Sequence, residues 1–228
     1  SSCKFFINER VSKGHFAFPS AGSVFKNNHE FGLPSGKIID NCELKGFQIG
    51  DSIEFKGTPE GLGMLVYIVK EGGTRRLLAD EGYGITQLVS LLLQINNNIQ
   101  MCIQPDMESG NYIYPPKLIC VEEPEVHLHP KYQSLLAEMF VEAYQKYNIH
   151  FIIETHSEYL IRKLQVMVAD KGNTLCPKDV SLSYVEKDEN GVSTNRKIEV
   201  QEDGRLSEPF GPGFFDESKT LVMEMLNF

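Results

Sequence analysis

The sequence lacks any apolar run of the roughly 18 residues that a membrane-spanning helix needs, and its first residues carry no signal-peptide pattern. Its five cysteines are odd in number and far apart, which argues against a disulfide framework and against a paired-cysteine zinc site. The chain also lacks internal repeats and an initiating methionine. We therefore expect a cytoplasmic protein with reduced thiols, and the loosely organised opening predicts a fragment of a longer protein.

Basic residues are fewer than acidic ones, with 22 Lys and Arg against 31 Asp and Glu, so the formal net charge of the 228-residue chain is -9 at pH 7. The average surface therefore repels polyanions, and a nucleic-acid contact would need a local patch or another part of an assembly. A chain of this length can bury a substantial core. Residues 1–60 are rich in glycine, asparagine and proline and carry no recognisable chemistry.

The most informative stretch covers residues 118–130, where an apolar run leads directly into a polar cluster. The uninterrupted run from Leu118 to Val121 predicts a short strand that is buried on both faces. Glu122 and Glu123 follow at once. On an extended chain they would point to opposite faces, so that one could serve a metal ion while the other faces a reacting water. The alternative is an ordinary turn with solvated acids.

A second polar cluster follows a second apolar strand. A helix is predicted over residues 130–147, with Pro130 as its first residue, and the strand 150–153 comes next. Strand, helix and strand in this order predict a βαβ unit with parallel strands. The ligand crevice of a parallel sheet lies beyond the carboxyl ends of its strands, so we expect the paired glutamates to meet His156 there. A lone histidine after a strand is more often structural.

Two glycines in the segment 80–87 stand just before a predicted helix, whose apolar residues recur at helical spacing: Ile85, Leu88, Leu92 and Ile95. The backbone N–H groups of a helix start, its dipole and the side chains of Thr86 and Gln87 could receive a phosphate. An ordinary glycine-containing loop, with Thr86 near the helix cap, is the alternative.

Other elements are predicted on both sides of these motifs. A hairpin with glycines in its turn is expected over residues 64–80, and two strands are expected at 180–185 and 194–200. A helix over about residues 217–226 should place its apolar side chains in the core, namely Leu221, Val222, Met225 and Leu226. The predicted parts of one compact unit are residues 1–80, 81–170 and 171–228.

Taken together, these motifs resemble those of the ABC-type ATPases of the chromosome-maintenance (SMC) and OLD-like kind, which in bacteria are often labelled AAA-family ATPases. Residues 118–125 resemble a Walker B motif with its catalytic glutamate, residues 128–130 the D-loop, residues 155–157 the switch-histidine loop and residues 80–87 the divergent signature motif. The motif order is that of the family. The ending, residues 211–217 and the helix after them, is similar to the tail of one bacterial branch of uncharacterised role.

The resemblance implies an α/β fold, namely the C-terminal lobe of an ABC-type P-loop NTPase with a parallel βαβ core and antiparallel hairpins at both ends. It also implies hydrolysis of ATP with Mg²⁺. Glu122 would hold the magnesium shell through water, Glu123 would be the base for the attacking water, and His156 would contact the γ-phosphate. Further nucleotide contacts are implied for Gly82, Gly84, Thr86, Gln87 and His129.

The partners implied by the resemblance are a second subunit and an N-terminal lobe. The signature residues would reach the nucleotide of the second subunit, so that ATP joins a homodimer, with DNA or an effector nuclease in phage defence downstream. No Gly-x-x-x-x-Gly-Lys-Ser/Thr sequence occurs in the chain, so the phosphate-binding loop and its lysine belong to that N-terminal lobe. The chain departs from the family at three positions. Glu122 replaces the usual Walker B aspartate, His129 replaces the usual D-loop aspartate, and Thr86 would stand for the signature serine.

Two other functions stay open on the sequence. Glu125, His127 and His129 alternate beyond a strand and, with Glu122 or His156, could form a zinc or two-metal hydrolase site. The other alternative is a non-catalytic interaction lobe whose site has decayed. The replacements at Glu122 and His129 support it.

Overall fold

The protein is represented by a computed structural model, which describes residues 2–7, 46–58, 61–70, 72–102, 104–105, 107, 112–172, 175–188 and 190–226. The chain divides by its contacts into two units. The sheet unit consists of Ser1–Arg10, Pro116–Glu125 and His129–Phe228, and the α2 unit consists of Val11–Pro115 and Val126–Leu128. The three-part division that the sequence suggests stays a prediction.

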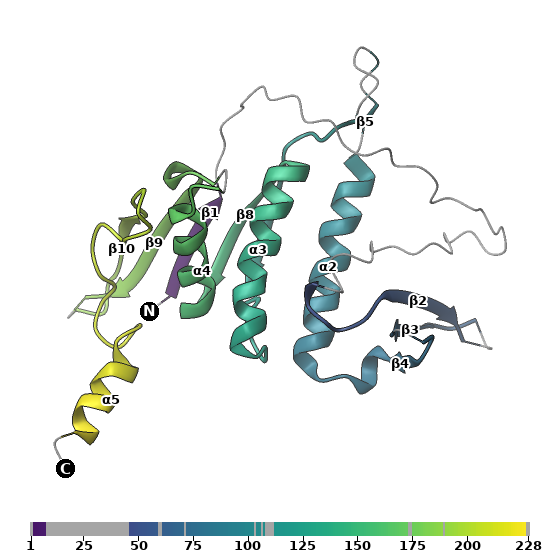
Figure 1. The fold of residues 1–228 in the computed structure, drawn as a ribbon, viewed down its shortest axis with the longest axis horizontal. Coiled ribbons are helices and arrows are strands. Elements are labelled where there is room, and N and C mark those ends of the chain that lie inside the picture. The colour runs from purple at the N-terminus through teal and green to yellow at the C-terminus, as the bar shows by residue number, and fades with distance from the viewer. Residues whose placement is uncertain are drawn as a thin grey trace. The chain divides into compact units, whose positions relative to one another are not determined.

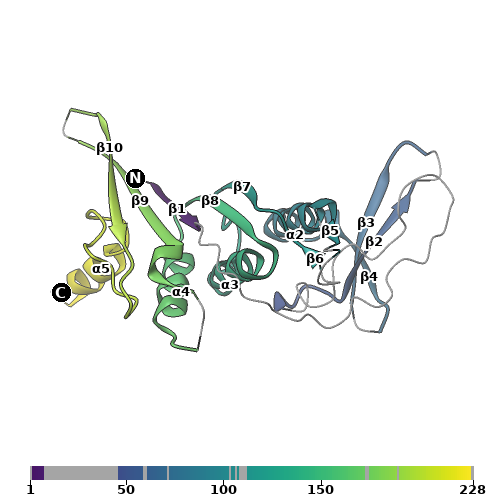
Figure 2. The ribbon, with the colours of Figure 1, turned by 90° about the horizontal axis from the view of Figure 1, so that it is seen from above.

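A five-stranded sheet organises the sheet unit, with strand order β10-β9-β1-β8-β7. Figure 1 labels the first four of these strands, and Figure 2 labels all five. Strands β7 and β8 are parallel, and Glu122 lies opposite Glu154 in their register. Strand β1 is antiparallel to both of its neighbours, β8 and β9, and β9 forms an antiparallel hairpin with β10. The bounds are Ser2–Ile7 for β1, Lys117–Glu122 for β7, Ile149–Thr155 for β8, Val180–Lys187 for β9 and Ser193–Glu199 for β10.

The predicted βαβ unit is confirmed. Helix α3 (Pro130–Tyr147) connects β7 to β8, and α4 (Glu158–Ala169) follows β8. The two helices pack against each other and lie on the same face of the sheet (Figure 2). Between them and the strands is the core of this unit, which includes Leu136, Phe140, Phe151, Ile153, Leu160, Ile161, Leu182 and Tyr184. The carboxyl ends of β7 and β8 are thereby fixed side by side.

Only one face of β7 is buried, so the prediction of a strand buried on both faces is wrong. Ile119 is 4% exposed, whereas its neighbour Leu118 is 62% exposed. Cys120 and Glu122, on the same side as Leu118, are exposed as well. The physical reason is that α3 and α4 cover one face of the sheet, and successive side chains of a strand point to opposite faces.

The C-terminal helix α5 (Glu217–Met225) forms where the sequence predicts it, but its apolar residues are not core. Leu221, Val222, Met225 and Leu226 are 51–74% exposed, and no residue of α5 is buried. A helix buries an apolar stripe only if another element packs on that stripe. The expectation of a core helix is therefore wrong for the described residues.

The α2 unit contains a three-stranded antiparallel sheet and a long helix. Strands β3 (Met64–Val69) and β4 (Arg75–Leu77) form the predicted hairpin, with Gly72 and Gly73 at φ +85° and +78° in its turn. The other elements are β2 (Ser52–Gly57), the short helix η1 (Leu78–Asp80), α2 (Tyr83–Cys102), β5 (Gln104–Pro105) and β6 (Tyr112–Ile113). Helix α2 buries the predicted stripe, including Leu88, Leu92 and Ile95.

Among the described residues, no helix combines the length and the apolar character that crossing a bilayer requires.

Candidate functional site

The two polar clusters meet at the carboxyl edge of the parallel pair β7–β8, as the sequence predicts. Glu122 and Glu154 are register partners at the ends of the two strands. Just beyond them, the backbone N–H of Glu123 donates to the carbonyl oxygen of Glu154 at 2.8 Å. This bond extends the pairing of β7 and β8 by one residue. It therefore holds the start of the loop after β7 against the end of β8.

The side chains of Glu123 and His156 face each other at this edge. The distance from Glu123 Oε1 to His156 Nε2 is 3.7 Å, and the two side chains are 52% and 50% exposed. Glu123 has a φ of +44°, an unusual value for a residue that carries a side chain, and such values concentrate at functional sites. The pair presents a proton acceptor and an imidazole donor to a ligand that comes from solvent.

The turn between β8 and α4 is held by side chains. Ser157 caps α4, because its Oγ accepts the N–H of Leu160 at 3.1 Å and donates to Gln133 Oε1 at 2.6 Å. The N–H of Ser157 itself donates to Thr155 Oγ1 at 3.0 Å. The backbone on both sides of His156 is therefore constrained.

Glu125 supplies one more bond to this turn, which the sequence alone did not indicate. Its Oε1 accepts the backbone N–H of His156 at 2.6 Å. The residue is 6% exposed, and its Oε2 is buried without a hydrogen-bond partner in the described part of the chain. From the sequence, Glu125 was considered only as a possible metal ligand. Its burial was not expected, because an acid in a turn is ordinarily solvated.

The zinc or two-metal alternative loses its geometric basis. The residues after Glu123 form turns rather than an extended strand, and His127 has a φ of +62°. Side chains at alternate positions therefore do not share a face, as they would on a strand. The described ranges contain no group of three His, Cys, Asp or Glu side chains arranged to hold a metal ion.

His129 and His127 each have a local structural contact. His129 is the N-cap of α3, and its Nδ1 accepts the N–H of Lys131 at 3.3 Å, while Pro130 follows as the first helical residue. The His127 ring meets the Tyr83 ring edge-on, with centroids 5.0 Å apart. The predicted helix start at residue 130 is confirmed, and the nucleotide contact of His129 stays a prediction.

The signature-like residues at the start of α2 are largely engaged within the α2 unit. The hydroxyl of Thr86 donates to the carbonyl oxygen of Leu78 at 3.3 Å. Gly84 is buried, and a Cβ atom built on it would lie 2.4 Å from the His127 carbonyl oxygen. Gly82 is exposed, with nothing within 4 Å of such an atom. Nucleotide binding by these residues and by Gln87 stays a prediction.

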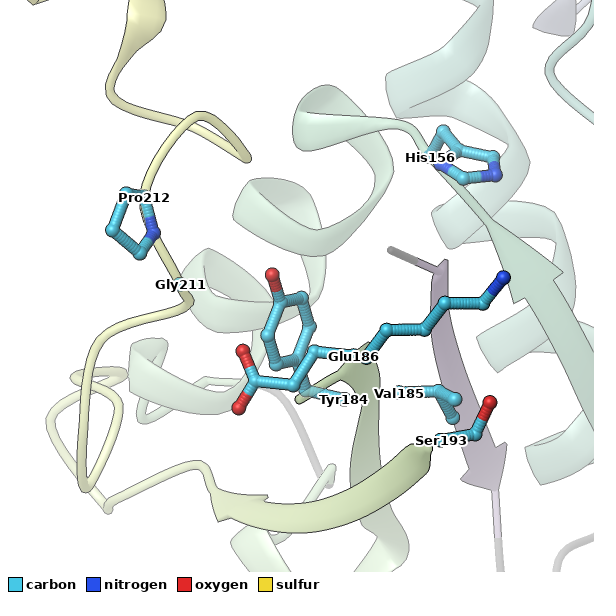
Figure 3. Close-up of a pocket in the computed structure, with 8 residues that line it drawn as sticks. His156, Tyr184, Val185, Glu186, Ser193, Gly211 and Pro212 are labelled. Atoms are coloured by element: carbon cyan, nitrogen blue, oxygen red, sulfur yellow. The ribbon is translucent and has the colours of Figure 1, made fainter. Parts of the chain in front are cut away.

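A pocket of about 520 Å³ adjoins His156 on the side of β9 (Figure 3). Tyr184 and Glu186 of β9 line it from one side, and Gly211 and Pro212 of the tail after β10 line it from another. The tail packs closely on β9 at Gly211, where an added Cβ would lie 2.8 Å from Tyr184 Oη and 2.9 Å from Glu186 Oε2. His156 thus faces two neighbours, the Glu123 carboxylate and this pocket.

The tail is anchored to the sheet by Arg196 of β10. Its Nη1 lies 2.6 Å from Glu208 Oε2 and donates to the Pro209 carbonyl at 3.0 Å, and its Nε lies 3.6 Å from Glu186 Oε1. The hydrogen bond to Glu208, followed by the nearby negative charges, raises the pKa of Arg196. These contacts fix the course of the chain from β10 toward His156.

Aromatic rings complete the connection between the tail and the turn at His156. The cluster consists of Tyr184, Phe210, Phe214 and Phe215, with neighbouring centroids 4.4–5.4 Å apart. The Phe214 centroid lies 6.4 Å from that of His156, and the guanidinium of Arg162 in α4 lies 5.9 Å from that of Phe215. Sequence inspection missed this contact, although Phe214 and Phe215 lie in the stretch that resembles the tail of a bacterial branch.

Two family profiles match the chain. The profile of a family described as AAA ATPase domain matches residues 22–161, and a family described as Protein of unknown function (DUF3696) matches residues 175–225. The first match contains Glu122, Glu123 and His156. The second contains β9, β10, the tail and α5, so the pocket beside His156 is lined by residues of both matches.

Curated relatives match only a short segment. UDP-N-acetylenolpyruvoylglucosamine reductase of Treponema denticola is 65% identical over 40 residues, which is 18% of this chain and 12% of that protein. The reductase of Borrelia garinii subsp. bavariensis is 58% identical over 41 residues, 18% of this chain and 13% of that one. The chain thus spans about an eighth of the length of these curated relatives.

Among solved structures, a chain described under "Structural biochemistry of ATP-driven dimerization and DNA stimulated activation of SMC ATPases" is similar, with a TM-score of 0.47 and 13% sequence identity. The similarity covers 84% of this chain and 92% of that chain. A likeness of this size says nothing about the activity or assembly of the present chain.

Proposed function

The chain belongs to the AAA ATPase domain family, and from this premise we propose that it supplies the general base, the metal-binding carboxylate and the phosphate-sensing histidine of an ATP-hydrolysing site. The observation that supports the proposal most is the Glu123–His156 pair, 3.7 Å apart and half exposed at the carboxyl edge of two parallel strands. This edge is where ligands of parallel sheets bind.

Glu123 is the proposed general base. Its carboxylate is accessible to a water molecule, and its backbone is fixed by the N–H bond to Glu154 at 2.8 Å. An ionised carboxylate can orient a water through one oxygen and accept its proton as the water attacks. His156, which is held on the neighbouring loop, is proposed to donate from its imidazole to the terminal phosphate of ATP.

Glu122 is proposed to hold Mg²⁺ through its hydration shell. The residue is exposed, and it lies at the end of β7 in register with a second acid, Glu154. Oxygen donors of this kind suit Mg²⁺, which keeps most of its waters and is bound by one or two carboxylates together with substrate phosphates. When bound, the ion would neutralise charge on the transferred phosphoryl group.

The remaining contacts are proposed to join two subunits. Gly82, Gly84, Thr86, Gln87 and His129 would contact a nucleotide bound by a second subunit, so that ATP holds a homodimer together. The phosphate-binding loop would come from an N-terminal lobe of the same family, because the sequence Gly-x-x-x-x-Gly-Lys-Ser/Thr is absent here. A net charge of -9 favours a protein effector over a direct DNA contact by the average surface.

ATP hydrolysis tests the proposal directly. The chain alone should neither bind ATP tightly nor hydrolyse it, because most phosphate contacts are absent. Mixed with a polypeptide of the family that carries the Gly-x-x-x-x-Gly-Lys-Ser/Thr loop, it should form an active complex whose turnover depends on Glu123. Micromolar affinity for Mg-ATP in the isolated chain, or equal turnover of the Glu123→Gln complex, would refute the assignment.

A further inference from the structure

Glu125 is a buried carboxylate that joins the two catalytic loops, and no proposed role accounts for it so far. It belongs to the turn after β7, whereas the atom it binds, the backbone nitrogen of His156, belongs to the turn after β8. The 2.6 Å separation is short even for a charge-assisted hydrogen bond, a class that is stronger than bonds between neutral groups. It therefore ties the loop of Glu123 to the loop of His156.

The energetics of Glu125 are unusual for a residue that only supports the fold. The side chain is 6% exposed, and its second oxygen, Oε2, is buried without a hydrogen-bond partner among the described residues. A half-satisfied buried carboxylate opposes folding, because the group loses its hydration without full replacement. Costly polar groups of this kind are concentrated at functional positions.

The Glu125 carboxylate accepts the backbone N–H of His156, the residue whose imidazole is the proposed phosphate sensor. In the same turn, the N–H of Ser157 donates to Thr155 Oγ1, and in the loop after β7 the N–H of Glu123 donates to the Glu154 carbonyl. The N–H of His156 itself donates to Glu125 Oε1, which restrains the backbone that carries the imidazole. Together the three bonds restrain the two backbone segments from which the imidazole and the Glu123 carboxylate project.

We propose that Glu125 is a positioning residue, whose buried carboxylate holds the backbone of His156 so that the imidazole stands opposite Glu123. The catalytic consequence of this inference rests on the proposed ATPase function, but its geometric content does not. Glu125 touches neither nucleotide nor metal in this scheme. It acts through His156 and should affect turnover rather than the affinity for ATP.

Nuclear magnetic resonance on the intact chain tests the geometric part. Glu125→Ala removes the acceptor, so amide hydrogen exchange at His156 should accelerate by about 10- to 100-fold, the ratio expected for loss of a charge-assisted hydrogen bond. The nuclear Overhauser contacts between the His156 and Phe214 rings should weaken at the same time. Glu125→Gln, which keeps an acceptor at the same length, should restore most of the protection.

Asp179 provides a matched control. It is also a buried carboxylate, 8% exposed, and it accepts a backbone N–H, that of Cys176, at 2.8 Å. Asp179→Ala should accelerate exchange at Cys176 and leave His156 unchanged. If Glu125→Ala does not fold, Glu125→Asp, which withdraws the carboxylate by one methylene and keeps its charge, should still accelerate exchange at His156.

Unchanged exchange and unchanged ring contacts of His156 in Glu125→Ala, or in Glu125→Asp if that variant is the one that folds, would overturn the proposal. In the complex with the phosphate-binding loop, Glu125→Ala should lower kcat at least tenfold with KM for ATP within about threefold. If His156 moves as expected but the unsubstituted complex hydrolyses no ATP, the proposed function fails and the positioning role is supported. If His156 moves and kcat stays unchanged, the catalytic part of this inference is refuted.

Discussion

The side chains at the ends of β7 and β8 reach solvent, whereas those at the start of α2 are held within their own unit. Glu123 and His156 are half exposed and face each other. Thr86, by contrast, gives its hydroxyl to the Leu78 carbonyl, and Gly84 is buried against the His127 carbonyl. Both regions resemble motifs of one family, and of the two, the first leaves the proposed functional groups Glu123 and His156 half exposed.

The difference has a topological origin. Parallel neighbouring strands end at the same edge, so the polar residues that follow them start close together. A glycine before a helix offers N–H groups to an anion, but it also permits another backbone to approach closely, and Gly84 illustrates the second use. A motif at a strand end is therefore a better guide to an exposed site in this protein than a glycine at a helix start.

The largest effect is expected for Glu123→Gln in the complex with the phosphate-binding loop. The amide keeps the shape of the carboxylate but accepts no proton at neutral pH, so hydrolysis should fall by a factor of about 10² to 10⁴ with ATP binding and ATP-induced dimerisation retained. Steady-state kinetics, calorimetry and light scattering measure the three quantities. Glu122→Gln is the comparison, and it should weaken Mg-ATP binding as well. Equal damage to binding by both variants would invalidate the separate roles.

The second effect concerns the stability of the α2 unit. Gly84→Ala places a Cβ atom 2.4 Å from the His127 carbonyl oxygen, and overpacking of this kind should lower the free energy of unfolding by about 1–3 kcal/mol. Gly82→Ala is the matched control, because nothing lies within 4 Å of its added atom and the residue is exposed. Urea denaturation measures both. Equal stability of the two variants would show that Gly84 has no packing role.

A smaller effect is expected for Thr86→Val, which removes the hydroxyl but keeps the shape of the side chain. Loss of the bond to the Leu78 carbonyl should destabilise the chain by about 1 kcal/mol, and Thr86→Ser should restore most of it. Comparing the change in stability with the change in ATP turnover of the complex separates a structural role of the hydroxyl from a nucleotide-binding role. If Thr86→Val leaves stability unchanged and reduces turnover of the complex more than tenfold, the hydroxyl serves the nucleotide rather than the fold.

The smallest effect is expected at His129, the N-cap of α3. Aspartate is a stronger cap than histidine and also complements the helix dipole, so His129→Asp should raise the free energy of unfolding by about 0.5–1 kcal/mol. Thermal denaturation measures the change, with His129→Ala as the comparison. A destabilising His129→Asp would mean that the imidazole has a contact beyond the 3.3 Å bond to Lys131.

Much of the secondary structure could be predicted from local patterns. The helix that begins at Pro130, the glycine turn at residues 72–73 and the parallel pair around α3 each follow from residues close together in the chain. The convergence of Glu123 and His156 was also predictable, because one topological rule brings the ends of parallel strands together. These features depend on short-range chemistry or on a rule with few exceptions.

The sequence by itself therefore determined the helices α2, α3 and α5, the hairpins β3–β4 and β9–β10, the parallel βαβ unit and the edge where Glu122, Glu123 and His156 gather. Only the tertiary structure decided which side chains at that edge are buried, that Glu125 binds the backbone of His156, and that α5 leaves its apolar residues exposed. The physical reason is that burial and long-range hydrogen bonds depend on which element covers a residue. Residues 125 and 156 are remote in the chain, and no local pattern shows that they touch.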